Sequence, residues 1–351
     1  MMRNVIQISP TYPPNTGGVG YYAVSLAKCL IAKGIKSKFL MPDHSEQRAN
    51  NQELFGSKTS ELSILLEKHN AKEIILHFSG YGYATRGLCF DLIKQIKKWK
   101  DKHKERRLVT IFHEVYAEEA PIYKSAFWTE LPQKYIAKNL LKLSDCAVTT
   151  SKYAQSQLFA LNPEKKITVS NSFSNVGTVK RSKKLNKRKK TAIIFGGTSQ
   201  KNILYKDMFL NKKNYLSALD ALSVEQIIDI GPKVKGLKKI GHIPIKAIGI
   251  KSNAFISKLL SSAQAGLIFY AIHVMTKSSI AASYATHGVV IINFCKIKIL
   301  KTNEFALGVN FVSNVDEKKK LNYQKIVNRA KKLYKNNSPT KLALLISRFI
   351  K

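Results

Sequence analysis

Three glycines, Gly17, Gly18 and Gly20, stand between an apolar run and a helical pattern in SPTYPPNTGGVGYYAVSLAKCLIAKG, residues 9–34. Glycine lets the backbone approach a ligand closely, and a helix start offers N–H groups and a positive dipole end to a phosphate. The spacing is not the G-x-G-x-x-G of dinucleotide sites, and their later acidic residue is missing, Asp43 being the nearest. We therefore expect Gly17 and Gly18 to contact a different phosphate ligand, with a bare tight turn as the alternative.

His113 and Glu114 follow the apolar run VTIF, which predicts a strand. The carboxyl ends of parallel strands are where the active-site residues of α/β sheets gather. A histidine there can accept a proton or bind a sugar hydroxyl. We expect His113 and Glu114 to be catalytic, the alternative being a strand-end histidine that only binds a neighbouring carbonyl.

A second loop, HFSGYGYATRG at residues 77–87, also follows a predicted strand. Tyr81, Tyr83 and Arg86 give it hydroxyl donors, aromatic faces and a charge, a combination that suits a sugar ring. We expect these three residues to bind an acceptor, with a turn of packed tyrosines as the alternative.

Lys277, Ser278 and Ser279 stand just before a helical pattern rich in small residues. Serine caps helix N-termini, and a capped N-terminus beside a lysine suits a diphosphate. Gly197 closes another predicted strand, and Lys201 after it is a candidate second cation for the same phosphates. An ordinary capped helix and solvated lysines are the alternatives.

The elements that must position these residues alternate between short β-rich runs and helical patterns. That alternation predicts parallel sheets with helices on both faces. The periodicity predicts, among others, a helix at residues 131–143 and a strand at KKIGHI, residues 238–243. The basic run VKRSKKLNKRKK, residues 179–190, interrupts the alternation and has too few apolar residues to build core.

The chain of 351 residues is long enough for about two domains. We expect an α/β protein of two Rossmann-like, doubly wound domains facing a central cleft that can close and exclude water. The expected boundaries are 1–175 and 191–335 for the domains, 176–190 for a basic linker, and 336–351 for a C-terminal helix able to pack back on the first domain.

The formal net charge of +37 favours a polyanionic surface, either nucleic acid or an acidic membrane leaflet, unless it reflects a general lysine bias. Nucleic acid is not the expected partner, because no nucleic-acid motif is present and aromatic residues do not interleave with the basic runs. In LIKQIKKWKDKHKERR, residues 92–107, Leu92, Ile93, Ile96 and Trp99 share one helical face among lysines. That face could lie on an anionic membrane, or it could belong to a core helix with a solvated lysine side.

The longest apolar run, AGLIFYAI, is far shorter than the roughly 20 residues of a membrane helix. The N-terminal residues lack the apolar region of a signal peptide, so we expect a cytoplasmic protein, either free or peripheral on the inner face of the cell membrane. The four cysteines are expected to be buried free thiols, and no His/Cys spacing predicts a metal site. No cofactor is expected.

Several of these stretches resemble the GT-B glycosyltransferases of the family-4, glycogen-synthase-like type. The resemblance rests on their order: PPNTGGVGYYAVSLAKCLIAKG, LSDCAVTTSKYAQSQL, ISKLLSSAQAGLIFYA and KSSIAASYATHGVVII. The motifs YGYATRG, FHEVYA and SNVG are similar to those of a bacterial subgroup. The resemblance covers roughly residues 1–300.

The resemblance implies a hexosyltransferase, most often metal-independent, with a nucleotide-diphosphate sugar in the C-terminal domain and a glycan or lipid-linked acceptor in the N-terminal one. Cell-surface polysaccharide synthesis is the implied pathway. Lys277, Ser278, Ser279 and Lys201 would then hold the diphosphate, and the loop with Gly17 and Gly18 would reach the donor across the cleft. His113 matches a strand-end histidine that many members place near the transferred sugar.

One departure from the family is clear: Met275 and Ser283 stand where the family usually has two glutamates. The donor sugar, its base and the stereochemical outcome therefore stay open. Glu114, or else Glu118 or Glu119, could supply a carboxylate instead, with Glu114 the first choice. A catalytically inactive or isomerase-type GT-B protein and a basic nucleic-acid-binding protein remain alternatives.

Overall fold

The computed structural model describes residues 2–13, 18–42, 52–55, 61–117, 123, 125–179, 182–295, 311–312, 321–335 and 337–350. Gly17, Glu118 and Glu119 lie outside these described residues. The chain divides into two compact units. The first unit is Met1–Asn171 with Pro339–Lys351, and the second unit is Ser172–Ser338.

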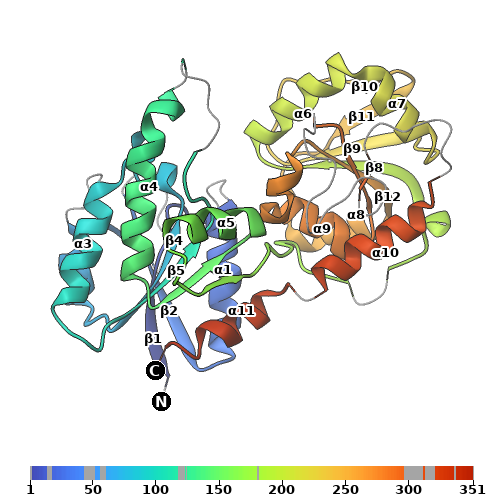
Figure 1. The fold of residues 1–351 in the computed structure, drawn as a ribbon. Helices are drawn as coiled ribbons and strands as arrows, with labels where there is room; N and C mark the ends of the chain where they lie inside the picture. Colours follow the sequence, from blue (N-terminus) through green and yellow to red (C-terminus); the bar gives the residue numbers. More distant parts are fainter. Residues whose placement is uncertain are drawn as a thin grey trace. The chain divides into compact units, whose positions relative to one another are not determined.

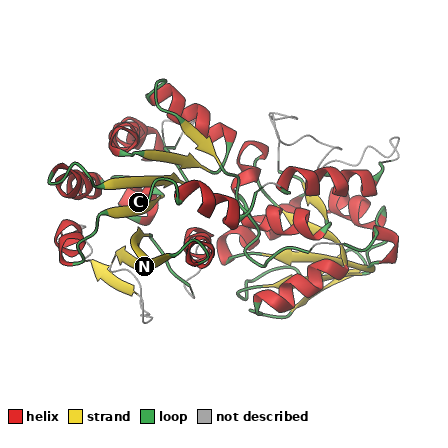
Figure 2. Cartoon of the chain, turned by 90° about the horizontal axis from the view of Figure 1, so that it is seen from below, coloured by secondary structure: helices red, strands yellow, loops and turns green. Residues whose placement is uncertain are grey.

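The first unit is built on a seven-stranded sheet in the order β3-β2-β1-β4-β5-β6-β7, and its neighbouring strands pair in parallel. Helices lie on both faces of the sheet (Figure 2), which explains why strands such as β4 are buried along their whole length. The strands are β1 (Arg3–Ile8), β2 (Ile35–Pro42), β3 (Gln52–Phe55), β4 (Glu73–Phe78), β5 (Arg107–Phe112), β6 (Cys146–Thr149) and β7 (Ile167–Val169). The helices are α1 (Gly18–Ile31), α2 (Leu62–Lys68), α3 (Phe90–Asp101), α4 (Ser125–Leu143), α5 (Lys152–Leu161) and α11 (Pro339–Ile346).

The C-terminal helix α11 belongs to the first unit and packs against α1, although the two lie at opposite ends of the sequence (Figure 1). Leu342, Ala343 and Ile346 are its buried residues. The Arg3 guanidinium at the start of β1 donates to the carbonyl of Ile350, at 2.6 Å. The end of the chain is therefore held to its beginning.

The apolar face of α3 is part of the core of the first unit. Leu92, Ile96 and Trp99 are fully buried, and Trp99 Nε1 donates to the carbonyl of Ala71 at 2.9 Å. The lysines of the helix lie on its exposed side. A membrane-facing role for Leu92, Ile96 and Trp99 is therefore wrong, because these side chains already cover the sheet.

The second unit has a six-stranded sheet in the order β10-β11-β9-β8-β12-β13, parallel except for the antiparallel β10–β11 pair. The strands are β8 (Lys189–Phe195), β9 (Gln226–Ile230), β10 (Lys239–Ile240), β11 (Ile243–Ala247), β12 (Ala263–Ile268) and β13 (Val290–Asn293). The helices are α6 (Thr198–Leu210), α7 (Lys212–Asp220), α8 (Asn253–Ser262), α9 (Ser279–His287) and α10 (Tyr323–Tyr334). Each unit therefore has the doubly wound arrangement expected from the sequence.

The end of the expected basic linker, residues 176–190, is part of the second unit rather than a solvated connection. Lys189 and Lys190 begin β8, and Leu185 is buried. Arg188 is 7% exposed and donates to the carbonyls of Lys183, Ala263 and His287, each at 2.9 Å. Burial lowers the pKa of Arg188 to about 10, which still leaves it charged at neutral pH. A guanidinium has enough donors to satisfy three carbonyls, so this basic run contains a structural residue.

Candidate active site

In the first unit the strand order reverses between β1 and β4, and ligands of open α/β sheets bind at the carboxyl ends of strands beside such a reversal. Three described features lie there: the start of α1 after β1, the loop after β4, and His113 with Glu114 after β5. The described residues among those predicted in the N-terminal half, Gly17 excluded, thus gather at one edge of one sheet.

His113 is the centre of a buried polar cluster at this edge. Its Nε2 lies 3.2 Å from Nδ1 of His77, and the two rings are stacked with centroids 5.5 Å apart. His77 Nε2 in turn lies 2.7 Å from Oε1 of Gln7. The edge of the Tyr22 ring meets the His113 ring at 4.8 Å between centroids. All four side chains are buried.

The hydrogen bonds indicate which nitrogen of each imidazole carries the proton. Gln7 donates its amide to Ser37 Oγ at 2.8 Å, so its carbonyl oxygen faces His77 and requires a proton on His77 Nε2. The unprotonated Nδ1 of His77 then accepts from Nε2–H of His113. When His113 is neutral, it is thereby held with Nδ1 as its basic nitrogen. Burial, and secondarily the positive charge that His113 carries when it is protonated, hold the pKa of His77 well below its usual range, so His77 stays neutral at neutral pH.

His77, Gln7 and Tyr22 are the members of this cluster that sequence reasoning missed. His77 is the last residue but one of β4, which pairs with β5, and His113 follows the end of β5. Two histidines at matching ends of adjacent predicted strands were a usable signal. Gln7 gave none, because a single polar residue in a buried strand has many roles.

The Glu114 side chain accepts a hydrogen bond from Ser79, which lies outside the His113 cluster. Its side chain is exposed, and Oε2 accepts from Ser79 Oγ at 2.6 Å. The hydrogen bond joins the carboxyl ends of β4 and β5. Glu114, the next residue after His113, is therefore a solvent-accessible carboxylate whose position is fixed by Ser79.

The loop after β4 divides the predicted acceptor residues into two groups. Tyr81 is 54% exposed and its hydroxyl accepts from Gln133 Nε2, which also donates to the carbonyl of Arg86. Arg86 is exposed and has a positive φ of 58°. Tyr83, in contrast, is 2% exposed and its hydroxyl lies within hydrogen-bond distance of the carbonyls of Ile8 and His77. Tyr83 therefore ties β1 to β4 and offers no surface to an acceptor.

Gly18 and Gly20, the two described glycines of the glycine loop, have different surroundings. Gly18 begins α1, and a Cβ there would meet nothing within 4 Å. A Cβ on Gly20 would lie 2.7 Å from the carbonyl oxygen of Thr11, so Gly20 is required by close packing within the loop. The Gly20 N–H donates to Thr11 Oγ1 at 3.2 Å. Gly18 is thus the open position.

In the second unit the strand order reverses between β8 and β12. Gly197 follows β8 as the N-cap residue of α6, with open space at its Cβ position. Ser278 precedes α9 and its side chain accepts from the N–H of Ala281 at 3.2 Å, so the predicted N-cap is confirmed. Ser279 is the first residue of α9, and Lys277 immediately precedes the cap.

The position of α9 is fixed by close packing on β12. The Tyr284 ring lies over Gly266, where a Cβ would come within 2.6 Å of the ring. The Tyr284 hydroxyl donates to the carbonyl of Ile193 in β8, at 3.0 Å. Ser172 Oγ also donates to the carbonyl of Lys277, at 2.7 Å. The helix N-terminus is therefore rigidly held at the carboxyl edge.

Lys201, a predicted diphosphate ligand, is instead a core residue. It is 2% exposed, and its Nζ lies 2.7 Å from Oδ1 of Asp229, which is 3% exposed. The same Nζ donates to the carbonyl of Pro232 at 2.6 Å, and Tyr205 donates to Asp229 Oδ2 at 2.9 Å. The ammonium therefore already neutralises a buried carboxylate, and it is not placed to serve a phosphate.

Comparison with solved structures identifies the architecture. An alpha-glucosyltransferase in complex with UDP matches with a TM-score of 0.62 and 8% identity, covering 99% of both chains. Sucrose-phosphate synthase from Thermosynechococcus elongatus matches with a TM-score of 0.61 and 9% identity, covering 99% of this chain and 98% of that one. AviGT4, a glycosyltransferase involved in avilamycin A biosynthesis, matches with a TM-score of 0.54 and 12% identity, covering 99% of this chain and 97% of that one. The chain has the GT-B fold. No family model and no curated protein matches its sequence.

The two positions at which the resemblance would place glutamates, Met275 and Ser283, are closed to solvent. Met275 and Ser283 are both fully buried. Ser283 Oγ donates to the carbonyl of Ser279 at 2.7 Å and lies 3.0 Å from Ser174 Oγ. The hydroxyl of Ser283, bonded within its own helix, thus occupies one of the two positions, and the buried side chain of Met275 occupies the other.

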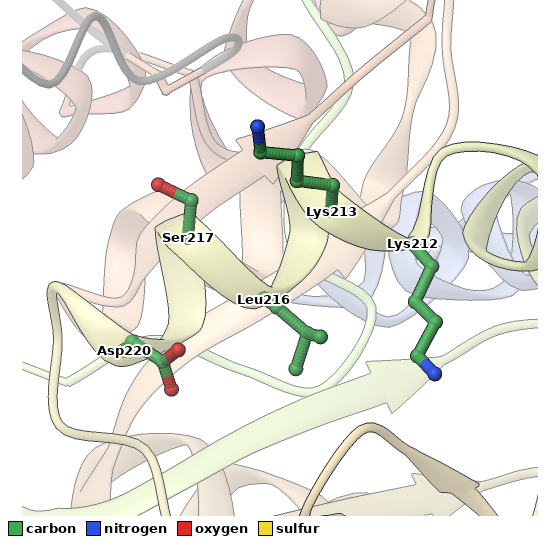
Figure 3. A pocket seen from close by; sticks show the side chains of 5 residues that line it. All are labelled: Lys212, Lys213, Leu216, Ser217 and Asp220. Atoms are coloured by element: carbon green, nitrogen blue, oxygen red, sulfur yellow. The ribbon is translucent and has the colours of Figure 1, made fainter.

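A hollow of about 500 Å³ lies elsewhere on the second GT-B unit, along α7 (Figure 3). Lys212, Lys213, Leu216, Ser217 and Asp220 line it, and none of them is a predicted site residue. Among the described residues, no three or more His, Cys, Asp or Glu side chains gather as metal ligands, and no helix is long and apolar enough to span a bilayer.

Proposed function

We propose that this GT-B protein transfers a hexose from a nucleotide-diphosphate sugar to a glycan or lipid-linked acceptor, in the cytoplasm, for cell-surface polysaccharide synthesis. The observation that carries the proposal is the match of nearly the whole chain to an alpha-glucosyltransferase in complex with UDP, TM-score 0.62. The gathering of His113, Glu114 and the start of α1 at one sheet edge supports it.

The donor is proposed to bind in the second unit. The N-terminus of α9 presents N–H groups and a positive dipole end, and Ser279 and the partly exposed Lys277 stand beside it. Gly197 provides backbone access at the start of α6. These groups can balance the charge of a leaving diphosphate, so we propose transfer without a metal ion.

The chemistry of the transferred sugar is assigned to the first unit. His113 would accept a proton or bind a sugar hydroxyl through Nδ1, in the tautomer that His77 fixes. Glu114 is the proposed carboxylate, and Gly17 and Gly18 the backbone contacts to the sugar. Tyr81 and Arg86 are the proposed acceptor contacts, since both are exposed.

A nucleic-acid acceptor is the second candidate. An alpha-glucosyltransferase of this fold has a structure in complex with UDP and a 13-mer DNA, with 9% identity and a TM-score of 0.58. The net charge of +37 would favour such a polyanion. Transfer of labelled sugar to duplex DNA, with an affinity that falls steeply with salt, would favour this acceptor over a glycan or lipid.

The proposal is tested by a donor panel of UDP-, GDP- and TDP-sugars. A ligand that binds only the folded state must raise the melting temperature. Radiolabelled transfer to glycan and lipid-extract acceptors then follows for each donor that binds. Binding without turnover on any acceptor would indicate an inactive protein, interconversion of the free donor would indicate an isomerase, and no shift with any nucleotide sugar would contradict the proposal.

A further inference from the structure

Helix α4 carries large apolar side chains on the side that does not face the core. Trp128 is 68% exposed and Leu131 76%, and Phe127 and Tyr135 are also exposed. At 100° per residue these four positions fall within one third of the helix circumference. The opposite side, with residues such as Ile136 and Leu140, is fully buried. A helix that is apolar on both sides has more apolar surface than it needs to pack against the core of its domain.

Helix α3 lies next to α4 (Figure 1) and adds one more exposed aromatic side chain to this side. The rings of Phe127 and Trp128 meet edge to face, with centroids 5.4 Å apart. Phe90 stands at the start of α3 and is 46% exposed, and its ring centroid lies 6.3 Å from that of Tyr135. We call Phe90, Phe127, Trp128, Leu131 and Tyr135 the aromatic platform.

Lysines continue the same surface along both helices. Lys138 and Lys142 follow Tyr135 on the outer side of α4 and are exposed, and Lys94 and Lys98 are exposed on α3. Two carboxylates lie nearby: Glu130, which pairs with Lys134 at 2.7 Å, and the exposed Asp91 next to Phe90. The exposed lysines outnumber them, so the charge beside the aromatic platform is mainly positive.

We propose that the aromatic platform and its lysines dock the protein on an anionic lipid bilayer. Tryptophan and tyrosine favour the bilayer interface, where the ring is apolar and its polar edge stays wet. Lysines beside them bury their stems and present their charge to acidic headgroups. The chain's charge of +37 adds long-range attraction. This surface is distinct from the apolar face of α3, and its lipid binding does not depend on the proposed sugar transfer.

The two tryptophans provide a direct test, because Trp99 is fully buried and Trp128 is not. In the full-length protein, acrylamide should quench Trp128 fluorescence, and vesicles of phosphatidylcholine with phosphatidylglycerol should protect it. Brominated phospholipids in those vesicles should quench it instead. The Trp128→Phe variant should lose both effects and keep the unchanged Trp99 signal. Protection that occurs equally with Trp128→Phe would overturn the proposal.

Co-flotation with the same vesicles measures the contribution of each part of the surface. Phe127→Ser/Trp128→Ser/Leu131→Ser should lower the partition coefficient more than about 10-fold. Lys138→Gln/Lys142→Gln should lower it about 30-fold at low salt. The matched controls lie on the second unit, at similarly exposed positions: Phe209→Ser/Leu210→Ser on α6 and Lys212→Gln/Lys213→Gln on α7.

Control variants that bind like the wild type, with unchanged melting temperatures for every variant, would support the assignment. Equal partitioning of the wild type onto neutral and anionic vesicles would overturn it. Platform-dependent self-association in the absence of lipid, with no flotation, would instead identify a second copy of the chain as the occupant.

Discussion

The Lys201–Asp229 pair gives the sharpest test of how the structure revises the sequence interpretation. Lys201→Met removes the ammonium and keeps an unbranched side chain of similar length. It leaves the Asp229 carboxylate, 3% exposed, with the Tyr205 hydroxyl, 2.9 Å from Oδ2, as its remaining side-chain donor among the described residues. Removing one partner of a buried ion pair costs about 3–5 kcal/mol, because the remaining charge stays desolvated. We expect a loss of that size in the free energy of unfolding.

The assay is urea denaturation with thermal denaturation beside it. At about 2–4 °C per kcal/mol for a unit of this size, Tm should fall by roughly 6–20 °C. Lys206→Met is the matched control, since Lys206 is an exposed lysine on the same helix, and it should change stability by less than about 0.5 kcal/mol. The double variant Lys201→Met/Asp229→Leu should recover much of the loss, because no unpaired charge remains.

A different result would refute this reasoning. If Lys201→Met kept the wild-type stability and instead weakened nucleotide-sugar binding, Lys201 would be a donor ligand, as its place after Gly197 first suggested. If Lys206→Met were equally destabilising, the effect would belong to the helix and not to the ion pair.

Four further outcomes are expected. Lys277→Ala should weaken UDP-sugar binding by about 1.5–3 kcal/mol, the scale of a lost charged hydrogen bond, and unchanged calorimetric affinity would exclude it from the site. Arg188→Ala should cost about 3 kcal/mol or more in urea denaturation, since three carbonyls lose their donor, whereas Lys184→Ala, exposed nearby, should cost little. His77 has a lowered pKa, so its contribution to stability is present above about pH 6.5 and is lost as the pH falls below it. His77→Gln should therefore reduce the slope of the unfolding free energy against pH in this acidic range by up to about 1.4 kcal/mol per pH unit. An unchanged slope would contradict a neutral buried His77. EDTA should leave sugar transfer unchanged, and a loss that Mg²⁺ or Mn²⁺ restores would contradict metal-independent transfer.

The fold could be predicted from the sequence because both sheets are covered on two faces. Their strands therefore read as short apolar runs between helical patterns. The failures are local. KKIGHI reads as one strand but forms the β10–β11 hairpin, because Gly241 adopts a φ of +57° between the two strands. Helix α4 begins at Ser125 rather than near residue 131, since Pro132 interrupts the pattern but is accommodated inside the helix.

The candidate site could be predicted only where a residue acts through its own neighbours in sequence. Ser278 caps a helix three residues away, so local pattern was sufficient. Lys201 and Arg188 are decided by distant partners, Asp229 and the carbonyls of β12 and α9, and a basic residue gives no sign of such a partner in sequence. The sequence therefore showed where basic residues gather, but it could not show that Lys201 and Arg188 are buried structural residues.

The same limit explains why the sequence left α3 with two alternatives, a membrane face or a core helix with a solvated lysine side, of which the structure shows the core helix. On α3 the periodic apolar residues are those that cover the sheet, because an amphipathic pattern specifies which side of a helix is apolar and not what covers it. The informative helix is α4, whose weak periodicity hid two apolar sides. Ile136 and Leu140 face the core, whereas Trp128 and Leu131 stay largely exposed on the other side of the helix. The proposed docking of α4 therefore rests on surplus apolar surface beside exposed lysines, and amphipathicity alone would have selected α3 instead.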